Sequence, residues 1–138
     1  MYKHILASTD GSDLAQKGVD QAITISKAMG SKLTVITVTE PYPLQSAATP
    51  ESWGDAQKVH ADAALKRAAD AAVKAGVNIE IAQVAGAPAE VIVHASKSLG
   101  CDLIVMASHG RRGVKRLLLG SQTAEVVAHS ETPVMVVR

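Results

Sequence analysis

The chain has 138 residues, of which 47% are hydrophobic and 20% charged, and its formal net charge is +1. This composition excludes a disordered chain and is typical of a single folded domain, which we expect over residues 1–138. The net charge is near zero, so we expect no nucleic-acid partner, and the single cysteine is typical of a reducing compartment. The sequence has no signal-peptide pattern and no stretch near ~20 apolar residues, so we expect a soluble cytoplasmic protein without a membrane partner.

Apolar runs alternate with helical patterns along the chain. The apolar runs predict five strands, at Ile5–Ser8, Leu33–Val38, Val77–Val84, Leu103–Ala107 and Val134–Val137. Capping and stop residues predict four helices between them, from Ser12 to Gly30, from Thr49 to Gly76, from Pro88 to Gly100, and from about Ser121. Ser12 is expected to cap the first helix and Thr49, followed by Pro50, the second.

Strands that alternate with helices form a parallel sheet covered on both faces. We therefore expect an α/β fold, a Rossmann-like three-layer α/β/α sandwich with a five-stranded parallel sheet of order 3-2-1-4-5. In that order the first and fourth strands are neighbours where the winding reverses, and ligands bind in the crevice at such a point. The first strand runs into Ser8-Thr9-Asp10-Gly11, and the fourth into Ser108-His109-Gly110. The two polar ends should face each other across one pocket.

The segment 101–124 has the order of features that a phosphate site needs. The apolar run ending at Ala107 leads into a loop with glycines at 110 and 113 and cations at 111, 112, 115 and 116. Gly120-Ser121-Gln122-Thr123 then opens a helical stretch. Glycines let the backbone approach an anion, and the N–H groups and dipole of a helix N-terminus favour negative charge.

These motifs also resemble those of the universal stress protein family. The family's loop has the form Gly-two residues-Gly-nine residues-Gly-Ser/Thr, and here Gly110, nine residues and Gly120-Ser121 match it. Ala107 stands where the pattern has its first glycine. Further similarities are the residues 5–12, the Gly86-x-Pro88 step and the apolar C-terminal run from Pro133.

The resemblance implies binding of an adenine nucleotide, ATP or AMP, with or without Mg²⁺. It assigns the nucleoside to Ser8, Thr9 and Asp10, and the adenine to Val38. It assigns the phosphates to the backbone and hydroxyl groups of Ala107, Gly110, Gly120, Ser121, Gln122 and Thr123. Arg111 and Arg112 lie where they could attract phosphate. The alternative roles are a cap of the Gly11 turn for Asp10 and a core contact for Val38.

His109 is a candidate phosphate contact, or else an ordinary polar loop residue. Ser108 and His109 should not form a catalytic dyad, because adjacent residues rarely point at each other. The histidines lack metal-ligand spacing, so the sequence predicts neither a metal site nor catalytic residues. Tyr42 and Trp53 flank the loop at 43–52 and are candidates to pack a lid or a partner surface.

The expected function is that of a nucleotide-responsive binding module related to stress. Two alternatives stay open. A nucleotide-free scaffold is compatible with Ala107, and a related fold carries ATP-hydrolysing and nucleotidyl-transferring enzymes, for which we expect at most slow hydrolysis here. The apolar residues 133–138 are expected at a sheet edge, where they would pair two chains into a homodimer.

Overall fold

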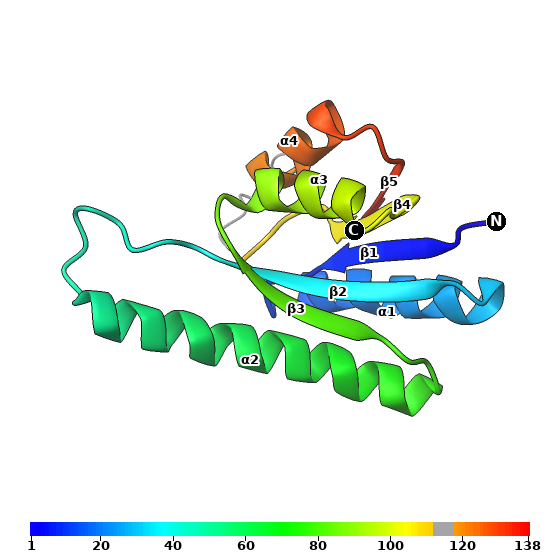
Figure 1. Ribbon diagram of the computed structural model, residues 1–138, viewed down its shortest axis with the longest axis horizontal. Coiled ribbons are helices and arrows are strands. Elements are labelled where there is room, and N and C mark those ends of the chain that lie inside the picture. The colour runs from blue at the N-terminus through cyan, green and yellow to red at the C-terminus, as the bar shows by residue number, and fades with distance from the viewer. Residues whose placement is uncertain (112–117) are drawn as a thin grey trace.

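A computed structural model describes residues 1–111 and 118–138 as a parallel sheet with helices on both faces (Figure 1). The elements in chain order are β1 (His4–Ser8), α1 (Asp13–Met29), β2 (Lys32–Thr39), α2 (Pro50–Ala75), β3 (Glu80–Ala85), α3 (Pro88–Ser98), β4 (Leu103–Ala107), α4 (Ser121–His129) and β5 (Val134–Val137). The strand order is β3-β2-β1-β4-β5 and every pair is parallel. The predicted fold class and strand order are confirmed.

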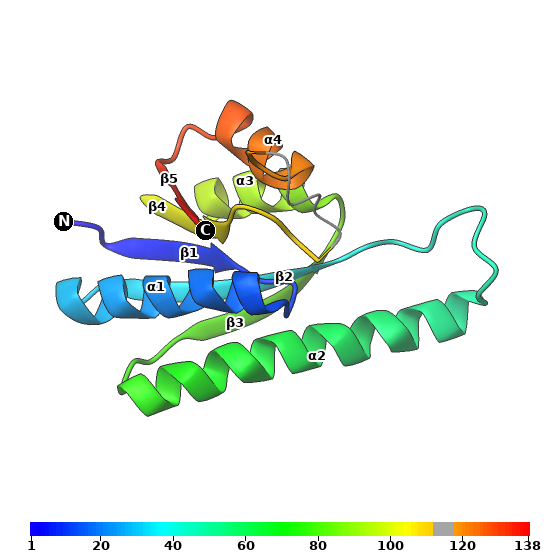
Figure 2. The ribbon, with the colours of Figure 1, turned by 180° about the vertical axis from the view of Figure 1, so that it is seen from behind.

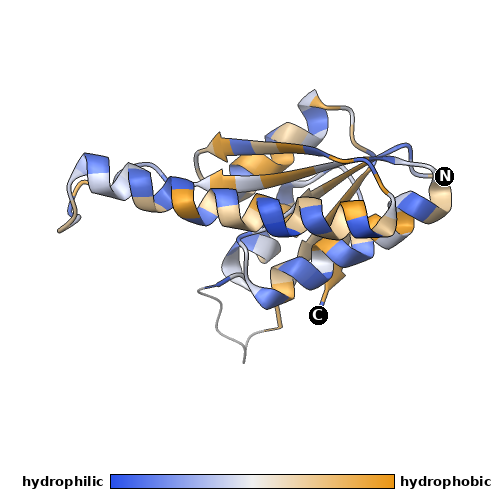
Figure 3. Cartoon of the chain, turned by 90° about the horizontal axis from the view of Figure 1, so that it is seen from below, coloured by the Kyte–Doolittle hydropathy of each residue, from blue (hydrophilic) through white to orange (hydrophobic). Residues whose placement is uncertain are grey.

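Alternate residues of the central strands face opposite sides of the sheet, and both sides are buried. One apolar cluster lies under α1 and α2 and takes the strand residues Ile5, Ala7, Leu33, Val35, Leu103 and Val105. A second cluster lies under α3 and α4 and takes Leu6, Ile36, Ile104 and Met106. Figure 2 shows α1 and α2 together on one face, and Figure 3 shows the strands as the most hydrophobic layer.

The predicted helix starts are confirmed for α1 and α2. The Ser12 side chain accepts a hydrogen bond from the N–H of Ala15. Thr49 forms a capping box with Ser52, and Pro50 is the first residue of α2. Gly30 and Gly76 end these helices with positive φ, 65° and 74°. The sequence was sufficient to predict the ends of these helices, because each capping residue bonds within its own turn.

The predicted start of the third strand was wrong. Residues 77–79 lie outside β3, which begins at Glu80 opposite Thr34. The backbone N–H of Val77 instead bonds to the carbonyl of Ala72, as part of the α2 C-terminus. Val77 and Ile79 pack against the apolar cluster under α2, so their hydrophobicity serves the core without a strand partner.

Cys101 lies in the apolar cluster under α3, as a free and buried thiol. Burial, with a smaller contribution from the Asp102 charge, raises its pKa to about 11. The thiol is therefore protonated at neutral pH. Among the described helices, none is long and apolar enough to cross a membrane.

Candidate functional site

A cavity of about 370 Å³ opens where β1, β2 and β4 end, with α2 and the N-termini of α3 and α4 around it. Every described residue that the sequence predicts to contact nucleotide lines this cavity: Ser8, Thr9, Asp10, Val38, Ala107, His109, Gly110, Arg111, Gly120, Ser121, Gln122 and Thr123. Arg112, the remaining predicted residue, lies outside the described residues. The structure thus brings the two polar strand ends together.

The turn after β1 is built by its own side chains. The Thr9 hydroxyl accepts a hydrogen bond from the N–H of Gly11 (3.1 Å), and Oδ1 of Asp10 accepts one from the N–H of Ser12 (2.9 Å). Gly11 has a φ of 84°, which a residue with a side chain rarely adopts. Asp10 therefore fills its predicted structural role as the cap of this turn.

Asp10 also ties the end of β1 to the loop after β4. Its Oδ2 accepts a hydrogen bond from the backbone N–H of Arg111, and its carbonyl accepts one from the Arg111 guanidinium (2.6 Å). A Cβ at position 110 would lie 3.0 Å from Oδ2 of Asp10, so Gly110 makes this close approach feasible. The Arg111 side chain is directed at β1 and α2, and its Nη1 lies 3.3 Å from Nδ1 of His60.

The hydrogen bonds decide the charge state of Asp10. Burial acts to raise its pKa, but the hydrogen bonds from Ser12 and Arg111 and the Arg111 charge outweigh burial and lower it. Asp10 is therefore a carboxylate at neutral pH. Two ionised oxygens offer about four acceptor positions, so the two backbone N–H groups and the Ser12 hydroxyl leave capacity for a ligand hydroxyl.

A short backbone contact brings the α4 N-terminus to the end of β4. The N–H of Gly120 donates to the carbonyl of Ser108 (2.7 Å). A Cβ on Gly120 would lie 3.3 Å from that carbonyl oxygen and from Cα of His109. The glycine thus avoids crowding against the protein's own backbone, independently of any ligand.

Thr123 is engaged inside the protein. Its side chain is 3% exposed, and its hydroxyl donates to the carbonyl of Ala107 (2.8 Å). The sequence predicts that this hydroxyl holds phosphate, whereas the structure uses its proton to join α4 to β4.

The first turn of α4 has no side-chain cap, because its N-cap residue is Gly120. The exposed residues Ser121 and Gln122 lie at this end of the helix, on the cavity wall. Oε1 of Gln122 accepts a hydrogen bond from the N–H of Ala89 (3.2 Å), and so caps α3 from the neighbouring helix. Backbone N–H groups at an uncapped helix N-terminus favour an anion.

Ser108 and His109 were predicted not to point at each other, and this prediction was wrong. The Ser108 hydroxyl lies 3.0 Å from Nδ1 of His109, within hydrogen-bond distance, because the chain turns sharply after β4. Ser108 is only 2% exposed, however, so its hydroxyl faces the protein interior.

The sequence analysis missed the part of the wall that comes from α2 and α3. Gln57 and His60 of α2 line the cavity beside Glu40, and Pro88 and Ile92 of α3 line it beside Met106. With Val38, the side chains of Ile92 and Met106 supply an apolar surface of the kind that suits a flat ring.

The length of α2 explains its contribution. Its 26 residues span about 39 Å, whereas the eight residues of β2 span about 26 Å. The helix runs antiparallel to the strand, so its N-terminal turns extend beyond the carboxyl edge of the sheet (Figure 1). The helix predicted from Thr49 to Gly76 was already longer than the strand before it. This difference in length was the one sign in the sequence that α2 would overhang the sheet and reach the cavity.

Within residues 1–111 and 118–138, no three His, Cys, Asp or Glu side chains are grouped so that they could hold a metal ion.

The sequence and fold are similar to those of known proteins. The model of the universal stress protein family matches residues 1–138. A universal stress protein of Methanocaldococcus jannaschii is 33% identical over all of this chain and 83% of its own length. One of Thermus aquaticus is 37% identical over the whole of both chains.

Solved structures of this family have the same fold. A universal stress protein in complex with cAMP has a TM-score of 0.78 and 32% identity, over 99% of this chain and 97% of its own. One from Archaeoglobus fulgidus in complex with dAMP has a TM-score of 0.77 and 19% identity, over 99% and 98%. At that identity the second likeness concerns the fold alone.

The lowered pKa of Asp10 gives a prediction about stability. In the unfolded chain an aspartate titrates near ~3.9, so the folded-state charge of Asp10 stabilises the fold above that pH, and this contribution is lost as the pH falls through its folded-state pKa. We expect Asp10→Asn to lower the free energy of unfolding at neutral pH, and the difference from the parent protein to shrink in acid.

Urea unfolding of both proteins from about pH 7 to about pH 3 measures this difference. Two other carboxylates also have lowered pKa values, Asp62 through a hydrogen bond from Lys58 and Asp102 through one from the backbone of Lys3. Both are present in the parent protein and in the variant, so their contributions cancel in the difference between the two free energies of unfolding. A difference that is the same at every pH would contradict the assignment.

Proposed function

Because the chain belongs to the universal stress protein family, we propose that it binds an adenine nucleotide, ATP or AMP, in the cavity at the ends of β1 and β4. We propose further that it acts as a nucleotide-responsive binding module in the stress response. The observation that carries the proposal is the juxtaposition of the Asp10 carboxylate with the uncapped N-terminus of α4 on one cavity.

Each side of the cavity suits one part of a nucleotide. Asp10 is ionised and retains acceptor capacity, which suits a ribose hydroxyl. The apolar surface with Val38 suits a base. The first-turn N–H groups of α4, with the Ser121 hydroxyl, suit phosphate oxygens. Mg²⁺ would accompany ATP as a counterion of the phosphates.

The departure at Ala107 is compatible with this proposal. Ala107 is the last residue of β4, pairs with Val137, and is 7% exposed. None of the described residues other than glycine has a positive φ, so position 107 needs no glycine conformation. Ala107 therefore introduces no backbone strain at the end of β4.

Nucleotide binding should raise the melting temperature. At about 100 times its dissociation constant a ligand adds roughly 2.7 kcal/mol to stability, which for this chain length is a shift of about 5–10 °C. Thermal unfolding with millimolar ATP, ADP and AMP tests this. The absence of a shift with all three would contradict the proposal.

A proline at position 121 tests the phosphate side specifically. Ser121→Pro removes one N–H and the hydroxyl but keeps the helix, because proline is favoured at the first helical position and Gly120 is already extended, with ψ of 160°. We expect it to remove most of the nucleotide-induced shift. Asp13→Pro makes the same backbone change at the start of α1, where it also removes the exposed ion pair with Arg67, and should leave the shift intact. A substitution of Gly120 would not test phosphate binding cleanly, because a side chain there would disturb Ser108 and His109.

Any hydrolysis of the nucleotide should be slow. Fast phosphoryl transfer needs a group that positions the nucleophile. Asp10 is already bonded to Ser12 and Arg111, and Glu125 is exposed further along α4. We expect turnover of ATP below about 1 s⁻¹, measured on protein free of contaminating ATPase. A faster rate would favour the enzyme alternative.

The C-terminal strand should pair two chains. β5 lies at the sheet edge, and its four residues are all partly exposed. The carbonyls of Pro133 and Val137 accept hydrogen bonds from Ile104 of β4 and from Ser108 just after it. The N–H of Val136, one residue before Val137, is therefore directed to the open edge. Pairing of β5 with the same strand of a second chain about a two-fold axis would satisfy these open backbone groups.

We expect light scattering to give twice the 14.3 kDa mass of one chain, and Val136→Pro to give a folded monomer, since proline is tolerated at an edge. A monomeric parent protein would contradict the dimer. A Val136→Pro protein that stays dimeric would contradict this interface.

A further inference from the structure

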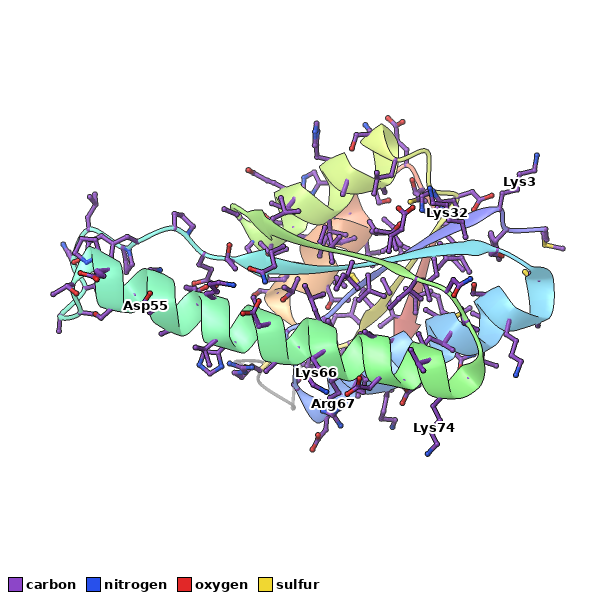
Figure 4. All side chains as sticks on the ribbon, turned by 60° about the horizontal axis from the view of Figure 1, so that its bottom comes forward. Lys3, Lys32, Asp55, Lys66, Arg67 and Lys74 are labelled. Carbon is purple, nitrogen blue, oxygen red and sulfur yellow. The ribbon has the colours of Figure 1, made fainter. Side chains whose placement is uncertain are left out.

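The loop between β2 and α2 stands away from the rest of the molecule, together with the first turns of α2 (Figure 1). Figure 4 shows Asp55 on this overhanging part of α2, while Lys66, Arg67 and Lys74 lie further along the helix, beside the sheet. We call residues 41–53 the arm.

Two aromatic side chains hold the arm in its conformation. Tyr42 and Trp53 are in edge-to-face contact, with ring centroids 6.5 Å apart and an interplanar angle of 78°. The Tyr42 hydroxyl donates to the carbonyl of Ala48 (2.6 Å), which closes the loop on itself. Trp53 is the only tryptophan in the chain.

The arm meets the cavity wall at Glu40. Its carbonyl accepts a hydrogen bond from Nε1 of Trp53 (3.0 Å), and its N–H donates to Oε1 of Gln57 (3.0 Å). Glu40 and Gln57 both line the cavity, whereas Trp53 contacts Glu40 without lining the cavity itself. The backbone of Glu40 is therefore held by α2 on both sides, once at the cavity and once at the arm.

We propose that Gln57 is a positioning residue that couples the cavity to Trp53 through Glu40, so that the arm is the part of this chain that responds to the nucleotide. The proposal rests on the proposed function, since it concerns the same cavity.

The physical basis is that the Gln57 and Trp53 hydrogen bonds hold this part of the wall to α2. Both bonds are exposed to water, where a hydrogen bond adds little net stability, so the free arm should open frequently. A ligand that touches Glu40 and Gln57 binds the closed arrangement better than the open one. It therefore shifts the population towards the closed arm.

Acrylamide quenching of the single tryptophan measures the arm directly. We expect saturating AMP or ATP to reduce the quenching constant of Trp53 by about two-fold or more, as the closed arrangement becomes dominant. Nucleotide binding is measured on the same samples by the melting shift, so the two properties are read independently.

Gln57→Ala removes the link between Glu40 and the cavity. Because Gln57 itself lines the cavity, we expect this variant to bind nucleotide more weakly and, at a nucleotide concentration that saturates it, to lose the change in Trp53 quenching. Gln45→Ala makes the same chemical change inside the arm, away from the cavity, and should respond like the parent protein.

A melting shift with unchanged quenching in the parent protein would overturn the coupling alone. A quenching change that survives in Gln57→Ala would overturn the role of Gln57. The absence of both a melting shift and a quenching change would overturn the proposed function and the coupling with it.

Discussion

Burial on both faces of the sheet forces β1 and β4 to be apolar wherever neighbours cover them, so, apart from His4 at the start of β1, polar groups appear only where these strands end. Because the strands are parallel and adjacent, their polar ends meet at one edge. The bonds between Asp10 and Arg111 form at this meeting point and join two segments about one hundred residues apart in the chain. The cavity, the charge of Asp10 and the position of residues 108–111 all follow from this adjacency.

The glycines of the site serve the protein's own packing as much as any ligand. Gly110 leaves room for the Asp10 carboxylate, and Gly120 leaves room for the backbone of Ser108 and His109. A glycine spacing that resembles a ligand motif is therefore also a requirement of the fold. Such a motif alone does not separate a binding protein from a scaffold, whereas the uncapped start of α4 beside an ionised carboxylate favours binding.

The helices α2 and α3 complete the cavity in different ways. α2 overhangs the sheet edge and brings Gln57 and His60 to it, with Arg111 reaching across to His60. α3 begins with Pro88 and takes its cap from Gln122 of α4 instead of from its own N-cap residue. The cavity wall therefore depends on contacts between helices as well as on the strand ends. Because α2 contributes both to this wall and to the arm, the helix connects the two.

The sequence by itself determined the order of elements, the parallel sheet and the helix caps at Ser12 and Thr49, because hydrophobic periodicity and capping act over a few residues. It also indicated the two polar strand ends, since their chemistry is visible in short motifs. Only the tertiary structure decided that Thr123 bonds to Ala107, that Gln122 caps α3, that Ser108 meets His109, and that Gln57 and His60 reach the cavity. These outcomes depend on the angle and overhang of packed elements, which the spacing of residues along one chain does not specify.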